Sequence, residues 1–272
     1  MSKHGLLVVE GPTDQAVLRR ILRKLLAFEE FRGGFEDLDT FWRDVAKVVP
    51  TYPPRKGPLG ERLAMPAILS NERWSVAVYS GGGSKLVDQV NALIQNHDLQ
   101  DKLDAFAVIA DADHDAPSKV GAHYRRAFER QFPGLPHACG EVAAGPPAAG
   151  IFVLPDNRQQ GVVEHLVLEC GEVAYAGHLA RARQYVGDFK PKDRQSAKWR
   201  PFDEEKAIVA SVASLLKPGK TNAVSLGDNE WIGDASRDRP MLRGLLDFLT
   251  ALLGLDQSAT RSAVVSQGPI EG

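Results

Sequence analysis

Acidic side chains follow two apolar stretches of the sequence, where they could share a divalent metal ion. Asp111 and Asp113 come after the stretch at residues 106–110, and Glu10 comes after the stretch at residues 5–9. Two carboxylates that are two residues apart on an extended chain point to the same side and can bind one cation. Phosphodiester chemistry uses such a cation to neutralise developing charge and to activate water.

The apolar stretches indicate strands of a buried parallel sheet. Residues 106–110 form an uninterrupted apolar run, as expected of a strand that is covered on both faces. Strands and helices alternate four times along the chain, which predicts an α/β, Rossmann-like fold with a central, mainly parallel sheet and right-handed crossovers. Because chemistry sits at the carboxyl ends of parallel strands, the acids are expected to meet at one edge. The predicted strands are residues 5–10, 75–80, 106–110 and 150–154.

The length of 272 residues allows either one large domain or one domain with a substantial appendage. A helix over residues 12–28 has an apolar stripe, and its basic residues, Arg20 among them, are expected on the opposite, polar face. An apolar final helix over residues 241–255 is expected to pack on the main domain. The predicted division is a catalytic domain over 1–172 with an insertion at about 29–73, a mostly helical extension over 173–256, and a flexible tail over 257–272.

Composition excludes several classes of protein. The formal net charge is −2, so any nucleic-acid site must be a local basic patch. Cys139 and Cys170 lack metal-ligand spacing and are expected to be free thiols in a reducing compartment. No apolar run approaches the roughly 18 residues of a membrane span, and because the chain enters a strand at once, no signal peptide is expected. A cytoplasmic protein with no membrane contact is expected.

Two segments could contact phosphate. Aromatic residues alternate with cations between residues 181 and 200, which suits backbone contact and base stacking, although a solvated charged surface is the alternative. The glycine turn at 81–83 is either a tight strand-to-helix turn or a backbone phosphate contact. It lacks the GxxxxGK[ST] spacing of an ATP-binding loop. The predicted nucleic-acid contacts are Gly82, Lys85, Lys190, Lys192, Arg194, Lys198 and Arg200.

The ordered motifs resemble those of a known family. VEGPTD at 9–14, the glycine turn at 81–83 and DAD at 111–113 follow the order of the TOPRIM domain. This is the Mg²⁺-binding module of topoisomerases, bacterial primases, recombination mediators and the overcoming-lysogenization-defect nucleases. The resemblance covers residues 5–170, and the segment at 154–164 is also similar to a group of uncharacterised bacterial TOPRIM-like proteins.

The resemblance implies roles for individual acids. Glu10 matches the glutamate that serves as general acid/base or as a metal ligand, and Asp111 and Asp113 match the pair that binds Mg²⁺. The acids expected to hold Mg²⁺ or Mn²⁺ are Glu10, Asp14, Asp111, Asp113 and Glu164, with Asp115 and Asp156 as secondary candidates.

Each acid also has a structural alternative. Glu10 could be a surface residue at a strand end, and the Asp pair could form a turn and cap a helix. Asp14 lies in the first turn of a helix, where a carboxylate favours the helix dipole. His114 is interpreted as a neighbour of the acids rather than a ligand.

The predicted function is a Mg²⁺- or Mn²⁺-dependent nuclease of DNA or RNA, in phage defence or repair, working with a separate ATPase partner. The zinc modules, the ATPase domain and the strand-cleaving tyrosine domain of the larger relatives have no counterpart in this sequence, and Lys198 is the lysine expected to stabilise the phosphate. The alternatives are a non-catalytic module that binds nucleic acid or a partner protein, and phosphoryl transfer on a small nucleotide. The sequence leaves open DNA or RNA, the number of metals, and monomer or homodimer.

Overall fold

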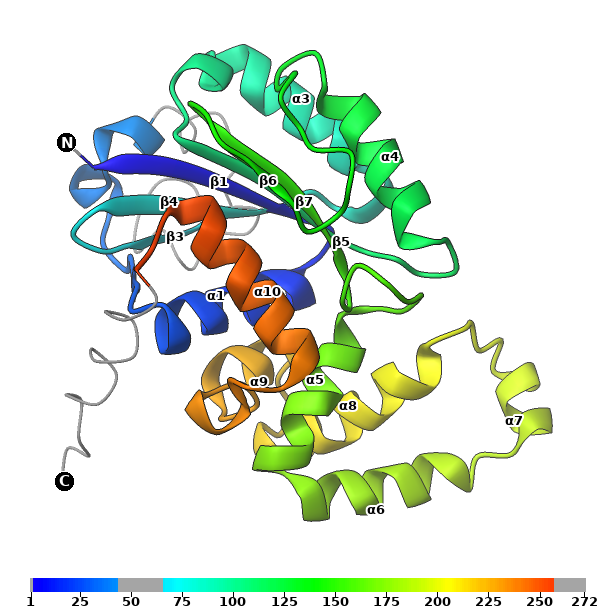
Figure 1. Ribbon diagram of the computed structural model, residues 1–272. Coiled ribbons are helices and arrows are strands. Elements are labelled where there is room, and N and C mark those ends of the chain that lie inside the picture. Colours follow the sequence, from blue (N-terminus) through cyan, green and yellow to red (C-terminus); the bar gives the residue numbers. More distant parts are fainter. Residues whose placement is uncertain (1, 44–65, 257–272) are drawn as a thin grey trace, which may run out of the picture.

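The computed structural model describes residues 2–43 and 66–256 (Figure 1). Residues 40–43 are helical. Much of the predicted insertion and the tail at 257–272 lie outside the described residues.

A single mixed sheet forms the centre of the described chain. Its seven strands follow the order β2-β3-β4-β1-β5-β7-β6 within the part that the structure describes. The four central strands pair in parallel, which confirms the predicted α/β, Rossmann-like class, whereas the three short edge strands pair antiparallel and were not predicted. The central strands are β1 (Lys3–Val9), β4 (Trp74–Ser80), β5 (Ala105–Asp111) and β7 (Ala148–Leu154), and the edge strands are β2 (Glu29–Glu30), β3 (Ala67–Ser70) and β6 (Val142–Ala143).

Helices cover both faces of the sheet, and the alternation of side chains along β1 shows how. Leu6 and Val8 join the core under α3 (Leu86–His97) and α4 (Pro117–Phe128). Leu7 and Val9 point to the other face and pack with α1 (Pro12–Leu25), α5 (Val163–Ala174) and α10 (Pro240–Leu253). Since both faces of a central strand are covered, a continuous apolar run is the expected pattern. Figure 1 shows α3 and α4 above the sheet and α1 and α10 below it.

The region after α5 is helical, as predicted, and its last helix packs on the sheet, as was also expected. Phe248 of α10 lies on Phe152 of β7, with ring centroids 5.5 Å apart. A Cβ atom at Gly150 would meet the Phe248 ring at 2.7 Å, so glycine permits this close packing. The intervening helices are α6 (Ala176–Gly187), α7 (Pro191–Ser196), α8 (Asp203–Leu216) and α9 (Asn222–Asp228), and the short 3-10 helices are η1 (Phe35–Asp37), η3 (Gly83–Lys85), η4 (Leu99–Asp101) and η5 (Asp234–Ser236).

Arg20 of α1 is buried, and the prediction that it faces solvent is wrong. Only 2% of the residue is exposed. Its Nε donates to the carbonyl oxygen of Ile232 at 2.9 Å, and its Nη2 lies 2.6 Å from a carboxylate oxygen of Glu230. Arg20 therefore holds the loop after α9 against α1, through a hydrogen bond to Ile232 and an ion pair with Glu230.

Each helix in the described ranges is too short or too polar to cross a lipid bilayer.

Candidate active site

The candidate site lies between two neighbouring parallel strands whose following helices pack on opposite faces of the sheet. β1 and β5 are paired, with Val9 opposite Ile109. α1 follows β1 on one face of the sheet, and α4 follows β5 on the other. A crevice forms outside the carboxyl ends of two such strands. Glu10 follows β1, and Asp111 is the last residue of β5, so both acids stand at this crevice.

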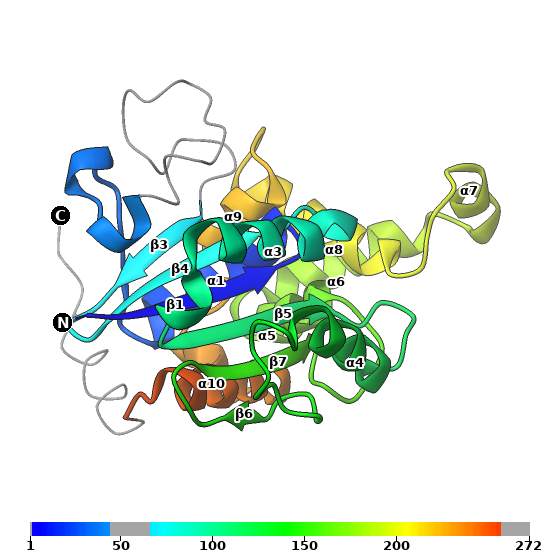
Figure 2. The same cartoon turned by 90° about the horizontal axis from the view of Figure 1, so that it is seen from above.

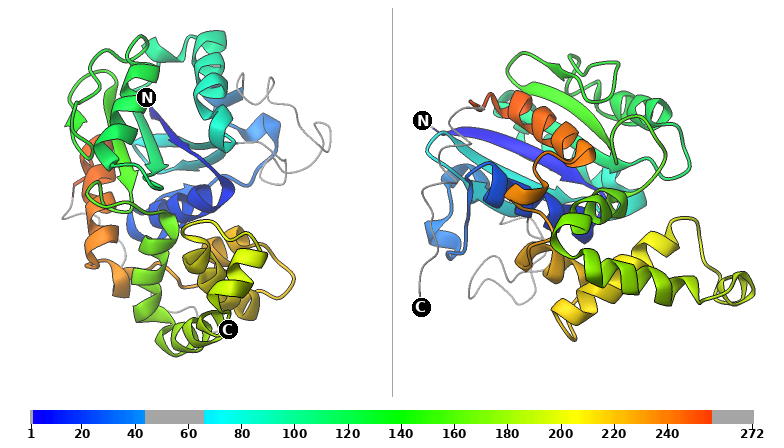
Figure 3. Two further views of the ribbon diagram at one scale, coloured as in Figure 1. Left: turned by 90° about the vertical axis from the view of Figure 1, so that its right-hand side faces the viewer. Right: turned by 60° about the horizontal axis from the view of Figure 1, so that its bottom comes forward.

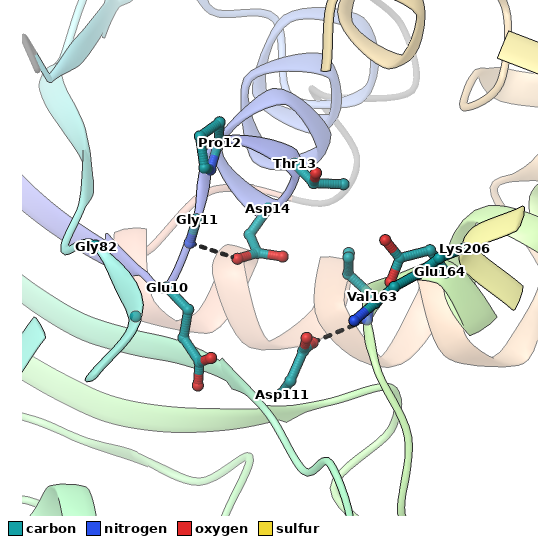
Figure 4. A pocket seen from close by; sticks show the side chains of 11 residues that line it. Glu10, Gly11, Pro12, Thr13, Asp14, Gly82, Asp111, Val163, Glu164 and Lys206 are labelled. Carbon is teal, nitrogen blue, oxygen red and sulfur yellow. Dashed lines mark hydrogen bonds between the residues drawn. The ribbon is translucent and has the colours of Figure 1, made fainter. Parts of the chain in front are cut away.

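A pocket of about 360 Å³ occupies the crevice (Figure 4). Four acids and one lysine line it, and the lining residues as a whole come from five separate parts of the chain. The first helix turn, the glycine turn after β4, the end of β5 and the beginnings of α5 and α8 all contribute. The lining residues are Glu10, Gly11, Pro12, Thr13, Asp14, Gly82, Gly83, Asp111, Val163, Glu164 and Lys206.

Glu10 is held by a tyrosine from the opposite face of the sheet. The hydroxyl of Tyr124 in α4 donates to Oε1 of Glu10 at 3.1 Å. Burial raises the pKa of Glu10, the hydrogen bond from Tyr124 opposes this rise, and the nearby charge of Asp113 adds to it. Burial and the neighbouring Glu10 carboxylate raise the pKa of Tyr124 far above its ordinary value, so the phenol remains a donor. Tyr124 was not predicted as a site residue.

Asp14 has a structural role and also belongs to the pocket. The backbone N–H of Gly11 donates to Oδ2 of Asp14 at 2.7 Å, which closes the first turn of α1. Burial raises the pKa of Asp14 to about 7, with further contributions from the charges of Glu10 and Glu164, while the Gly11 hydrogen bond opposes the shift. The helix-start interpretation of Asp14 is therefore confirmed, and its carboxylate is buried among other acids as well.

Asp111 and Glu164 are brought together by the start of α5. The N–H of Val163, the first residue of that helix, donates to Oδ1 of Asp111 at 2.8 Å. Burial raises the pKa of Asp111 well above its ordinary value, and Asp14, Glu10 and Glu164 raise it further. Burial also raises the pKa of Glu164, which is 7% exposed, and its Oε2 is buried without a hydrogen-bond partner.

Asp113 does not extend the strand, contrary to the expectation that it shares an extended chain with Asp111. β5 ends at Asp111, and Asp113 has a left-handed backbone with φ of 49°. Its N–H donates to the carbonyl oxygen of Gly161 at 2.8 Å, and the N–H of Gly161 donates back at 3.1 Å. Asp113 is exposed and outside the pocket lining, although its charge still raises the pKa of Glu10. Asp111 and Asp113 therefore do not present two adjacent carboxylates on one face of an extended strand.

Lys206 is the pocket lysine, whereas Lys198 had been expected to contact phosphate. Lys206 lies in the first turns of α8, and its charge lowers the pKa values of Glu10, Asp14 and Glu164. Lys198 is exposed and does not line the pocket. The helix that carries Lys206 was predicted at 203–216, but only the tertiary packing of α8 brings it beside the acids.

The glycine turn is a tight turn that also borders the pocket. The N–H groups of Gly81 and Gly83 donate to the carbonyl oxygens of Val9 and Glu10 at 2.8 and 2.9 Å. Gly82 has φ of 72°, a conformation that favours glycine, and it lines the pocket, whereas Lys85 is exposed outside it.

Other predicted residues lie away from the pocket lining. Asp115 is exposed and pairs with Lys119, and Asp156 accepts hydrogen bonds from the two backbone N–H groups of its own turn. The basic residues of the C-terminal part also lie outside the lining: Lys190, Lys192, Arg194, Lys198 and Arg200.

The donor set fits a hard divalent cation, although the acids are not arranged around one point. Across residues 2–43 and 66–256, no three His, Cys, Asp or Glu side chains form a metal-ligand group as they stand. Glu10, Asp14, Asp111 and Glu164 nevertheless border one pocket, and the buried Oε2 of Glu164 lacks a partner. Oxygen ligands without His or Cys suit Mg²⁺ or Mn²⁺. Binding of one ion by all four would require these carboxylates to move closer together than they now stand.

The crowded acids should make the metal-free protein less stable as the pH rises. The folded-state pKa of Asp14 is about 7, above its ordinary value of 3.8. Stability from this group is therefore fully present below about pH 4 and is lost as the pH rises through about 7. Asp14→Asn keeps an acceptor for Gly11 and removes the charge. We expect it to raise the free energy of unfolding in EDTA at pH 8 by about 1–2 kcal/mol, with a smaller rise at pH 5, where less of that stability has been lost.

Urea unfolding at both pH values measures this effect, and the exposed Asp115→Asn is the control. Equal destabilisation by Asp14→Asn at pH 5 and pH 8 would mean that Asp14 serves only as a helix cap.

Comparisons with known proteins give a family and a fold. A family model described as "Protein of unknown function (DUF3226)" matches residues 4–254. The chain belongs to the DUF3226 family. The DUF3226 match runs from β1 to the end of α10, so it includes the helical C-terminal part as well as the sheet.

A solved structure resembles this DUF3226 chain. The crystal structure of hypothetical protein PH0156 from Pyrococcus horikoshii OT3 has 18% sequence identity and a TM-score of 0.53, and the match covers 93% of this chain and 98% of that chain. At this identity the likeness supports the fold alone. A comparison with curated proteins gave no match.

Proposed function

We propose that this DUF3226 protein is a Mg²⁺- or Mn²⁺-dependent nuclease that hydrolyses phosphodiester bonds in DNA or RNA. The observation that carries the proposal is the pocket at the carboxyl ends of β1 and β5, where four acids line the same wall as one lysine. Asp14 and Glu164 are buried, and Glu10 and Asp111 are half-buried. The TOPRIM-like order of the sequence motifs supports the same chemistry.

Glu10, Asp14, Asp111 and Glu164 would hold the metal, and Asp113 would contribute charge from the rim. A bound divalent ion would supply charge neutralisation at the phosphate and a lower pKa for attacking water. Lys206 adds a fixed positive charge beside the same pocket, where it would stabilise a non-bridging phosphate oxygen. Tyr124 holds the Glu10 carboxylate in one orientation through its hydrogen bond.

Tyr124→Phe is expected to lower kcat about tenfold, because an oriented hydrogen bond to a catalytic carboxylate is lost. That hydrogen bond lowers the pKa of Glu10. The acid limb of the pH–rate profile should therefore move to higher pH in the variant. Tyr175→Phe is the matched control, since it removes a hydrogen bond to the N–H of Glu230 outside the pocket. An unchanged acid limb in Tyr124→Phe would contradict the role assigned to the phenol.

Cleavage assays test the proposed activity directly. The substrates are supercoiled plasmid, linear duplex, single-stranded DNA and RNA, each with Mg²⁺, Mn²⁺ or EDTA. Asp111→Asn is expected to abolish cleavage, and Asp115→Asn, which changes an exposed acid beyond the pocket, should cut at the parent rate. Equal cutting by Asp111→Asn would show that the activity does not use this pocket.

A folded protein that binds Mn²⁺ without cutting any substrate would favour the alternative, a non-catalytic module that binds nucleic acid or a partner protein. A pull-down would then look for the partner, with a separate ATPase of a defence or repair system as the expected candidate. Sedimentation would decide between a monomer and a homodimer. We propose a cytoplasmic location, which suits the free thiols of Cys139 and Cys170.

A further inference from the structure

A helical arm projects from the body of the molecule beside the pocket. We define the arm as residues 176–202, which include α6, α7 and the segments that follow them. Leu179, Ala182 and Val186 form the buried side of α6, which packs against α8. α7 lies at the far end of the arm, away from the sheet, in Figures 2 and 3.

The arm is basic in a protein whose overall charge is slightly negative. Residues 181–200 contain seven Lys and Arg residues and two acids, whereas the formal net charge of the chain is −2. Tyr185 on α6 is 75% exposed, so a flat aromatic surface stands among the cations. Such a combination suits a polyanion with stackable bases.

The structure divides these cations into two groups. Arg194 is used internally: it donates to Glu204 at 2.6 Å and to the carbonyl oxygen of Phe189 at 2.8 Å, and it lies over the Trp199 ring at 4.9 Å. Phe189 and Trp199 also contact each other, with centroids 5.3 Å apart, so the end of the arm has a small core of its own.

The second group is available to a ligand. Lys192, Lys198 and Arg200 are exposed, and their side chains form no ion pair or hydrogen bond with other residues of the described chain. Lys190 is also exposed but pairs with Asp188 at 3.8 Å. The packed end of the arm thus presents three unpaired cations rather than a network of surface salt bridges.

The base of the arm contacts the segment that follows β5 and the first turn of α5, both of which carry acids of the site. Phe202 stacks on His114, which follows Asp113, with centroids 5.0 Å apart and planes at 14°. Its edge also meets His165, which follows Glu164, at 5.4 Å. Directly after Phe202, α8 begins and places Lys206 in the pocket. The segment 197–202 therefore joins the unpaired cations to the pocket wall.

We propose that the arm binds the sugar–phosphate backbone of the nucleic-acid strand whose scissile phosphate lies in the pocket, through Lys192, Lys198 and Arg200. This inference rests on the proposed function for the identity of the substrate. Backbone contacts by lysine and arginine release condensed counterions, so they give salt-dependent affinity without sequence preference.

Binding is tested with the full chain carrying Asp111→Asn, so that a fluorescein-labelled single strand is not cut. Adding Lys192→Glu, Lys198→Glu and Arg200→Glu is expected to weaken binding at least tenfold. The slope of log K against log salt concentration should become shallower by about 2, since up to three phosphate contacts are lost at about 0.7 each.

The control is a second triple reversal, Lys102→Glu, Arg126→Glu and Arg130→Glu. Lys102 precedes β5, and Arg126 and Arg130 lie at the end of α4, so all three are at the opposite end of the strands from the pocket. The change in net charge is the same as in the arm variant. The control should bind within about twofold of the parent protein. If both triple variants weaken binding of the strand equally, the proposed role of the arm is wrong, because the change in net charge alone would explain the loss of affinity.

Turnover separates this inference from the proposed nuclease activity. With the wild-type pocket, the arm variant should raise KM for a long strand at least tenfold and leave hydrolysis of bis(p-nitrophenyl) phosphate unchanged, because that small diester does not reach the arm. Cleavage with an unchanged KM for long strands would contradict the binding role of the arm and support the nuclease activity. Arm-dependent binding without any cleavage would contradict the nuclease activity and support the binding role of the arm.

Discussion

Glu10→Gln is expected to reduce metal-dependent cleavage by about a thousandfold or more, the scale of loss when a catalytic carboxylate is removed. The amide oxygen of Gln can still accept the hydrogen bond from Tyr124, so the side chain should keep its place. What is lost is the negative charge that would bind the cation or move a proton. The measurement is kcat at saturating Mn²⁺ together with the Mn²⁺ affinity of the folded protein.

The control for this variant is Glu36→Gln, which changes an exposed glutamate in η1. It should cut at the parent rate. If Glu10→Gln retains cleavage within threefold of the parent and melts at the same temperature, Glu10 is neither a ligand nor a proton carrier, and the pocket must work through its other acids.

Arg20→Ala should lower the free energy of unfolding by about 2–4 kcal/mol, the range for a buried acceptor left without its donor together with a cavity in the core. The guanidinium of Arg20 is 2% exposed and binds the carbonyl oxygen of Ile232 and the carboxylate of Glu230. Alanine would leave that buried carbonyl without a donor and would open a cavity beneath the loop after α9.

Urea unfolding measures this loss, and Lys24→Ala is the matched control on the same helix. Lys24 is far more exposed and lies 3.9 Å from Glu230, so its removal should cost less than about 1 kcal/mol. Similar unfolding midpoints for Arg20→Ala and Lys24→Ala would mean that the buried contacts of Arg20 add little to stability.

The parallel strands and the acids at their ends could be predicted because the signals are local. A strand covered on both faces must be apolar throughout, and residues 106–110 satisfy that condition. Glu10 and Asp111 follow such runs directly. The rule that functional groups gather at the carboxyl ends of parallel strands was therefore enough to predict that they lie close together. Glu164 and Asp14 were expected through the resemblance, and both line the pocket.

The missed features depend on tertiary packing or on single backbone angles. Tyr124 and Lys206 come from helices that are predictable in themselves, but their rotation toward the pocket is set by the sheet and by α5. The burial of Arg20 requires the loop near Ile232, over 200 positions later, which no local pattern reveals. The left-handed turn at Asp113 is set by its pairing with Gly161, and it removes the second aspartate from the line of the strand.

The return of α10 to the sheet has a consequence for biosynthesis. The ribosome makes Glu10, Asp14, Asp111 and Glu164 well before it makes Lys206 and the helix that covers Phe152. A nascent chain that has just exposed the four acids therefore lacks both the cation that offsets their charge and the apolar cover of β7. The fold around the acids is completed only after α8 and α10 have been synthesised.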